Sequence, residues 1–169
     1  IDPVFLGTPL YRCEALEPVL GCAVSIKLET ANPVRSFKAR GTEVICVQPA
    51  GAPAMTHSGT SGALVTTDST DTIADGVAGR RPIPAVLADL LLVADDAVLV
   101  SEASIVAGMR VLLHHAGLVV EPSAALGIAA ILEDRDRFVG RHVVTIVCGS
   151  NVDVDAYHRW VGAALTHRP

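Results

Sequence analysis

Aromatic residues are scarce in this chain. Phe, Trp and Tyr make up 4% of its 169 residues, although half of all residues are hydrophobic. A core with so few rings has to be built from Val, Leu, Ile and Ala, and branched aliphatic strands are typical of parallel sheets that helices cover on both faces. Length and composition therefore predict a single α/β domain with an open, mostly parallel sheet covered by helices.

An excess of positive charge and long apolar runs are also lacking. The 18 acidic residues outnumber the 13 Lys and Arg residues, which gives a net charge of −5. This balance argues against general binding of nucleic acid. No uncharged stretch approaches the roughly 20 residues that a membrane helix needs. We therefore expect neither a nucleic acid nor a membrane as a partner.

The cysteines do not form a metal-binding or redox motif. Cys13, Cys22, Cys46 and Cys148 include no Cys-x-x-Cys pair, and no histidine cluster completes a zinc pattern. Cys46 and Cys148 lie in apolar, strand-like runs, where a free cysteine packs as a small hydrophobic residue. Reduced thiols in a cytoplasmic protein are the simplest interpretation.

Hydrophobic periodicity predicts the main elements of the later part of the chain. Helices are expected over residues 83–92, 102–116 and 124–133, and strands over 96–100 and 142–148. Residues 50–71 are rich in Gly, Ser, Thr and Pro and are predicted as a loop with at most a short helical turn. Residues 135–141 are predicted as a charged loop.

Lys38 follows a predicted strand over residues 24–29 and lies near the start of a predicted helix. Ser36 is a good N-cap residue, so Lys38 would lie in the first helical turn. The unpaired N–H groups and the positive dipole end there favour a phosphate and make an ammonium easier to deprotonate. A Schiff-base lysine needs such a deprotonated amine. The alternative is a solvated surface lysine.

The spacing after Lys38 is too short for a complete crossover. Thr42 and Glu43 are followed at once by a strand-like run over residues 44–47. Parallel strands need a connection of a dozen residues or more, and the six residues 36–41 are too few. The pattern predicts a segment missing at the junction of residues 43 and 44, either deleted or present in the protein but left out of this sequence.

Three motifs, in order, resemble one enzyme family. They are Thr8-Pro9-Leu10 with Ser36-Phe37-Lys38-Ala39-Arg40-Gly41, then Thr72-Ile73-Ala74-Asp75-Gly76-Val77, then Val119-Val120-Glu121-Pro122-Ser123. This order resembles the threonine/serine dehydratase and serine racemase branch of the pyridoxal-phosphate enzymes with the tryptophan-synthase-β-like fold. The resemblance implies an incomplete large domain, in which residues 1–43 correspond to the family's N-terminal part and 44–169 to its C-terminal part. The family's glycine-rich phosphate loop is not found, because the chain has no Gly-Gly pair.

The resemblance also implies a cofactor, pyridoxal 5'-phosphate, and the residues that contact it. Lys38 would be the catalytic residue and would bind the cofactor as a Schiff base. Phe37 would pack near the pyridine ring, and Gly76 would lie on the opposite face. Glu121 would lie beside the ring, and Cys148 would face the pyridine nitrogen.

Each of the later residues also has a structural interpretation. Thr72 could cap the start of a helix that Gly76 merely interrupts. Glu121 could be only a helix cap before Pro122, which suits the first helical position. Cys148 could be a buried apolar thiol at the end of a central strand.

We expect no metal ion. Metal-using relatives carry acidic residues at the positions of Gln48 and Ala54, and neither replacement serves a divalent cation as well. His57 is interpreted as a solvated loop residue, and His114 and His115 as capping residues in the last turn of a helix.

The implied activity is that of a pyridoxal-phosphate-dependent ammonia-lyase, which dehydrates L-threonine or L-serine to a 2-oxo acid and ammonia. A thiol at Cys148 would leave the pyridine nitrogen neutral, which favours elimination at the β-carbon. The alternatives are a serine racemase-like enzyme and a non-catalytic remnant or assembly module. We expect an amino-acid substrate, a homodimer and a cytoplasmic location.

Overall fold

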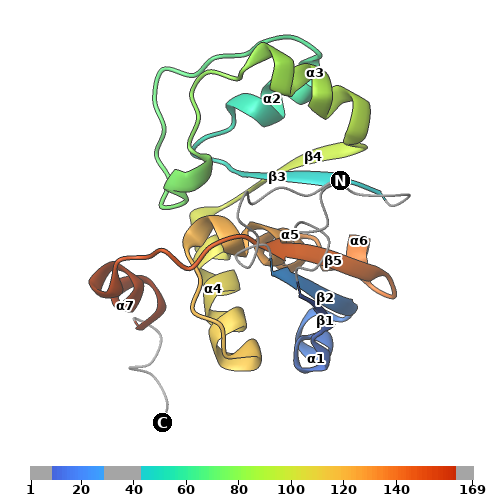
Figure 1. The fold of residues 1–169 in the computed structure, drawn as a ribbon, viewed down its shortest axis with the longest axis vertical. Coiled ribbons are helices and arrows are strands. Elements are labelled where there is room, and N and C mark those ends of the chain that lie inside the picture. The colour runs from blue at the N-terminus through green and yellow to red at the C-terminus, as the bar shows by residue number, and fades with distance from the viewer. Residues whose placement is uncertain (1–8, 29–42, 163–169) are drawn as a thin grey trace.

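The computed structural model describes residues 9–28 and 43–162 (Figure 1). Its strands are β1 (Leu10–Arg12), β2 (Ala23–Leu28), β3 (Ile45–Pro49), β4 (Asp96–Val100) and β5 (His142–Val147). Its α-helices are α1 (Glu17–Leu20), α2 (Ala54–Ser61), α3 (Pro84–Val93), α4 (Glu102–Ala116), α5 (Leu126–Glu133), α6 (Arg135–Phe138) and α7 (Val154–Gly162). Short 3-10 helices are η2 (Glu14–Leu16), η4 (Asp75–Val77) and η5 (Pro122–Ala125).

The strands of the described residues form two sheets. In the first, β1 pairs antiparallel with β2, and β2 pairs parallel with β5; in the second, β3 and β4 are parallel. The α/β class and the mostly parallel pairing agree with the prediction, but a single continuous sheet was expected. The two sheets are separate because helix α5 packs between them, in contact with β3, β4 and β5 (Figure 1).

Helix α5 can occupy this central position because it is apolar around its circumference. Leu126, Ile128, Ala129 and Ile131 are all buried in the core. Gly127 allows the closest approach to the first sheet, since a Cβ atom there would lie 2.0 Å from Oγ1 of Thr145 in β5. Helices α2 and α3 lie on the far side of the β3–β4 sheet, so helices cover both faces of that sheet (Figure 1).

Helix α4 has the boundaries that its capping residues predict. The Ser101 hydroxyl accepts a hydrogen bond from the Ser104 amide at 3.2 Å, and Gly117 ends the helix with a left-handed φ of 67°. Both observations follow the usual chemistry of helix ends. The start of α4 is also joined to the end of α5. Glu133, the last residue of α5, accepts hydrogen bonds from the Ser101 amide and hydroxyl, each at 2.7 Å.

The loop predicted over residues 50–71 is wrong in part, because α2 lies within it. Its polar side chains bond inside the helix: the Ser58 hydroxyl donates to the Ala54 carbonyl at 2.7 Å, and the Thr60 hydroxyl donates to the Thr56 carbonyl at 3.0 Å. Gln48 accepts from the Thr56 amide at 2.7 Å, which fixes the first turn. Composition does not reveal such contacts. The predicted loop over 135–141 likewise contains the single turn α6.

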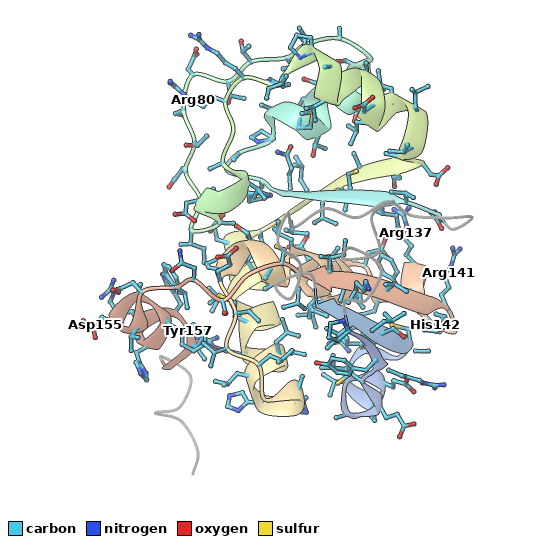
Figure 2. The ribbon with its side chains drawn as sticks, viewed as in Figure 1. Arg80, Arg137, Arg141, His142, Asp155 and Tyr157 are labelled. Atoms are coloured by element: carbon cyan, nitrogen blue, oxygen red, sulfur yellow. The ribbon has the colours of Figure 1, made fainter. Side chains whose placement is uncertain are left out.

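Glu43, at the predicted junction, is held by an ion-pair cluster. It pairs with Arg137 at 2.9 Å and with Arg141 at 2.7 Å, and Arg137 also pairs with Asp96 at the start of β4 at 2.6 Å. Figure 2 shows Arg137 and Arg141 on the same side of the molecule. The Arg137 hydrogen bond holds the pKa of Asp96 below its usual value. Residues 29–42 lie outside the described residues, so the missing segment stays a prediction.

Within the described ranges, no helix is both long and apolar enough to cross a membrane. The four cysteines all lie in these ranges, and none of them is joined in a disulfide. Burial raises the pKa of the Cys22 and Cys46 thiols, which makes both less reactive at neutral pH.

Candidate functional site

The candidate site lies at the carboxyl edge of the β2–β5 pair. Leu28, the last residue of β2, is the register partner of Val147, the last residue of β5. Cys148 and Gly149 follow β5 directly. The chain therefore leaves β2 at the edge where Cys148 leaves β5, and ligands of open α/β sheets bind beyond such edges.

Glu121 reaches this edge from η5. It occupies the N-cap position, with φ −71° and ψ 157°, but its side chain makes no capping hydrogen bond. Its amide donates to the Gly149 carbonyl at 3.1 Å. Its carboxylate lies against the Gly149 backbone, because a Cβ atom on Gly149 would be 2.2 Å from Oε1 and 2.7 Å from Oε2. Glu121 thus occupies the predicted cap position before Pro122, but its side chain does not cap the helix.

Gly76 faces the same edge from η4. A Cβ atom on Gly76 would lie 2.9 Å from the Ser123 hydroxyl and 4.0 Å from Oε1 of Glu121. A larger residue at position 76 would thus displace η4 from η5, and glycine permits the close approach. Two of the predicted site residues, Gly76 and Glu121, are brought together.

The Thr72–Val77 motif is not the start of an α-helix. It forms the three-residue 3-10 helix η4, whose N-cap position is Ala74. Thr72 does accept a hydrogen bond from the Ala74 amide at 3.1 Å, so its hydroxyl orders the turn without capping a helix. The Ile73 amide donates to Oε2 of Glu102, at the start of α4, at 2.9 Å.

Ser123 and Gly149 are site residues to which sequence reasoning gave no role. Ser123 is buried, with 8% of the residue exposed, and its hydroxyl has no hydrogen-bond partner among the described residues. An unpaired buried hydroxyl costs about 1–3 kcal/mol, so each one calls for an explanation, and a bound ligand is one such explanation. The available signal was position, since Ser123 is in the Glu121 motif and Gly149 follows Cys148.

Of the other three predicted site residues, Cys148, Phe37 and Lys38, the structure describes only Cys148. Cys148 is half-buried and lies next to Gly149, which contacts Glu121. Phe37 and Lys38 lie outside the described residues.

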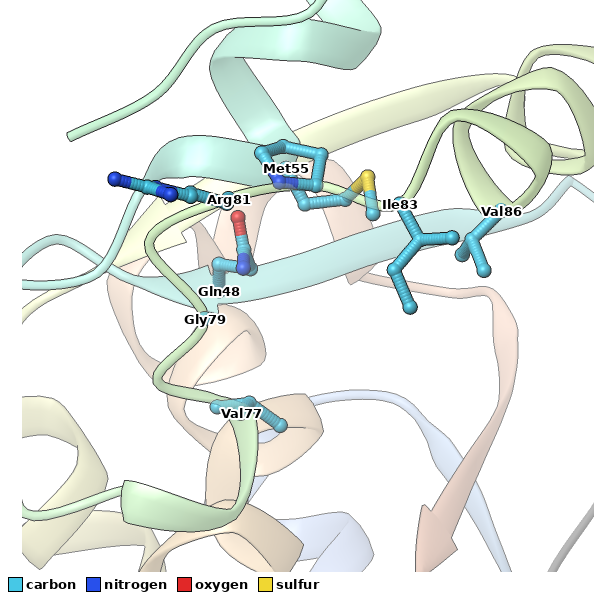
Figure 3. A pocket seen from close by; sticks show the side chains of 8 residues that line it. Gln48, Met55, Val77, Gly79, Arg81, Ile83 and Val86 are labelled. Carbon is cyan, nitrogen blue, oxygen red and sulfur yellow. The ribbon is translucent and has the colours of Figure 1, made fainter.

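A separate cavity of about 260 Å³ lies between α2, α3 and the segment after η4 (Figure 3). Its lining includes Gln48, Met55, Ile83 and Val86, and of η4 only Val77 contributes. None of Gly76, Glu121 and Cys148 lines it. Gln48 uses its Oε1 to accept from the amide and hydroxyl of Thr56 at 2.7 and 3.0 Å. This cavity is not the candidate site.

The groups at the sheet edge fit the ring end of pyridoxal phosphate. Gly76 and Gly149 present bare backbone, which a flat ring can approach closely. Glu121 supplies a carboxylate, and Ser123 supplies a hydroxyl that no described residue engages. A glycine-rich phosphate loop is not among these groups, in keeping with the absence of any Gly-Gly pair from the sequence.

Comparisons with known proteins agree with this chemistry. The sequence pattern of a family described as "Pyridoxal-phosphate dependent enzyme" matches residues 41–149. The L-threonine dehydratase biosynthetic IlvA of Bacillus subtilis is 35% identical over 113 residues, which are 67% of this chain and 27% of that protein. The chain thus spans about a third or less of the length of such relatives.

Solved structures give the same result. Threonine deaminase isoform 2 of Solanum lycopersicum superposes with a TM-score of 0.67 at 31% identity, over 73% of this chain and 35% of that chain. Maize serine racemase superposes with a TM-score of 0.61 at 28% identity, over 74% of this chain and 39% of that chain. These neighbours confirm the predicted tryptophan-synthase-β-like α/β fold.

Proposed function

Because the chain belongs to the pyridoxal-phosphate-dependent enzyme family, we propose that it is part of an ammonia-lyase acting on L-threonine or L-serine. The products are a 2-oxo acid and ammonia. The names of the similar proteins, threonine dehydratase and threonine deaminase, support this substrate class. The proposal concerns the whole protein, since the chain covers only part of its relatives' length.

One observation carries the assignment of the site. Glu121 lies at a helix N-cap but forgoes the capping hydrogen bond and places its carboxylate against Gly149, within reach of Gly76. A half-buried carboxylate needs a reason to lie there. A cofactor ring beside Glu121, at the carboxyl edge of the sheet, supplies that reason.

The residues then have distinct roles. Bound pyridoxal phosphate supplies an electron sink for negative charge at the substrate Cα atom. Lys38 would hold the cofactor and accept the Cα proton on Nζ. Phe37 and Gly76 would contact the ring, and the Cys148 thiol would leave the pyridine nitrogen unprotonated. Loss of the β-hydroxyl as water gives an enamine, and hydrolysis returns one water to yield the 2-oxo acid and ammonia.

The test is a product assay with the purified protein, pyridoxal phosphate and L-threonine. We expect 2-oxobutanoate, formed at a rate that depends on the cofactor, and we expect Lys38→Ala to abolish it. If no 2-oxobutanoate forms and no visible absorbance of bound cofactor appears, the proposal is refuted for this chain.

Serine racemization is the second candidate, and the similarity to maize serine racemase supports it. Chiral analysis of L-serine incubations separates the two activities. D-serine without pyruvate would indicate a racemase. If neither compound forms although pyridoxal phosphate binds, a non-catalytic remnant or assembly module is the better description.

We also propose a homodimer, a reducing cytoplasmic location and a missing segment between residues 43 and 44. The lack of a disulfide among the described cysteines supports the location. Light scattering should give twice the subunit mass, and a monomer would contradict the dimer. An intact mass well above 17.6 kDa would show that the segment is present in the protein and absent only from this sequence.

A further inference from the structure

Glu102 makes a contact that helix capping does not explain. It lies in the first turn of α4, where the Ser101 side chain already serves as the cap. A carboxylate that only favoured the helix dipole could stay in water. Instead, Oε2 of Glu102 accepts the Ile73 amide at 2.9 Å, and Oε1 is buried with no hydrogen-bond partner among the described residues.

The start of α4 is a fixed point from which such a contact can act. Glu133, the last residue of α5, binds the Ser101 amide and hydroxyl at 2.7 Å. Helix α5 continues from η5, which carries Glu121 and Ser123 to the site. Glu102 is therefore attached to the same rigid unit that presents the η5 side of the site.

Apart from Glu102, the Thr72–Val77 motif is supported by Ile73 and Val77, which pack partly buried against the core, and by the Thr72 hydroxyl, which accepts from the Ala74 amide at 3.1 Å. None of the three residues of its short helix η4 is buried, and two of them, Asp75 and Gly76, are exposed. The buried Ala74 side chain and the Glu102 bond to Ile73 fasten the motif just before Gly76. The bond thus fixes the segment whose Gly76 packs against Ser123 and faces Glu121.

We propose that Glu102 is a positioning residue of the cofactor site. By holding the Ile73 amide, its carboxylate sets how closely the Gly76 backbone approaches the cofactor ring. The inference rests on the proposed function, because it assumes that pyridoxal phosphate binds between Gly76 and the end of β5.

The test compares Glu102→Ala, Glu102→Gln and a control, Ser101→Ala. The control removes the cap of α4 and the Ser101 hydroxyl bond to Glu133, but it keeps the Glu102 side chain and the bond from the Ser101 amide to Glu133. Two quantities are measured in each folded variant: hydrogen exchange of the Ile73 amide by NMR, and the dissociation constant of pyridoxal phosphate by fluorescence titration.

We expect Glu102→Ala to speed exchange of the Ile73 amide at least tenfold and to weaken cofactor binding at least fivefold. Glu102→Gln should stay within about twofold of the unchanged protein in both quantities, because its amide oxygen can accept the same bond. Ser101→Ala should lower the melting temperature and leave both quantities unchanged.

Two results would overturn the inference while leaving the proposed function intact. One is cofactor binding by Glu102→Ala that equals that of the unchanged protein. The other is equal weakening of binding by Glu102→Ala and Ser101→Ala, which would indicate a general effect of the α4 terminus. If the unchanged protein binds no pyridoxal phosphate, the proposed function fails, and the positioning role fails with it.

Discussion

Replacing Ser123 by Ala should leave the chain at least as stable as before. The hydroxyl is buried and has no hydrogen-bond partner in the described part of the chain, and such a group costs about 1–3 kcal/mol relative to a satisfied one. Its removal recovers most of this cost and loses only the packing of one oxygen atom. We expect Ser123→Ala to raise the free energy of unfolding by about 1 kcal/mol.

Ser58 is the matched control, because it is a second buried serine whose hydroxyl, unlike that of Ser123, forms hydrogen bonds with described residues. Its hydroxyl donates to the Ala54 carbonyl at 2.7 Å and accepts from the Val65 amide at 2.8 Å. Each hydrogen bond contributes about 1 kcal/mol, so Ser58→Ala should lower the free energy of unfolding by about 2 kcal/mol. Any gain in helix propensity acts in the same direction in both variants.

Urea unfolding followed by circular dichroism measures both variants under the same conditions. The two changes should have opposite signs and differ by about 3 kcal/mol. If Ser123→Ala loses as much stability as Ser58→Ala, then the Ser123 hydroxyl has a partner, and it no longer indicates a ligand site.

Three further predictions concern the site, the packing and the pH dependence. Gly149→Ala should weaken pyridoxal phosphate binding at least fivefold, because its Cβ atom would displace the Glu121 carboxylate; unchanged affinity in a fluorescence titration would contradict this. Gly127→Ala should cost about 1–3 kcal/mol in urea unfolding, since its Cβ atom would overlap a hydroxyl of β5, and a neutral effect would show that the two elements can separate freely. The Arg137 bond lowers the folded-state pKa of Asp96 from 3.8, so its contribution is present above about pH 4 and is lost as pH falls through the folded pKa. Arg137→Gln should therefore flatten the loss of stability below about pH 4, and identical acid titrations of unfolding would exclude this role.

Capping residues and apolar runs in the sequence predicted the elements whose ends are set by residues at those ends. Ser101 and Gly117 bound α4 as expected, and β4 coincides with the apolar run over 96–100. The separation into two sheets could not be predicted in this way. It depends on where α5 inserts, and an apolar helix can cover one sheet or divide two.

The site was predictable as motifs but not as contacts. The motifs that contain Gly76 and Glu121 predicted residues that do meet, whereas the position of Glu121 alone suggested a cap. Ser123 and Glu102 were missed because their significance lies in tertiary contacts. Ser123 lies against the Gly76 backbone across the site, and Glu102 accepts a hydrogen bond from the Ile73 amide, 29 residues earlier in the chain. Sequence spacing carries no direct record of such contacts.

The chain contains only two lysines, Lys27 and Lys38, which allows a direct test of the cofactor assignment. Incubation with pyridoxal phosphate, reduction with borohydride and peptide mapping by mass spectrometry identify the lysine that binds the cofactor. We predict a phosphopyridoxyl label on Lys38, which persists in Lys27→Arg and disappears in Lys38→Arg. A label confined to Lys27, or no label on either lysine, would contradict the account.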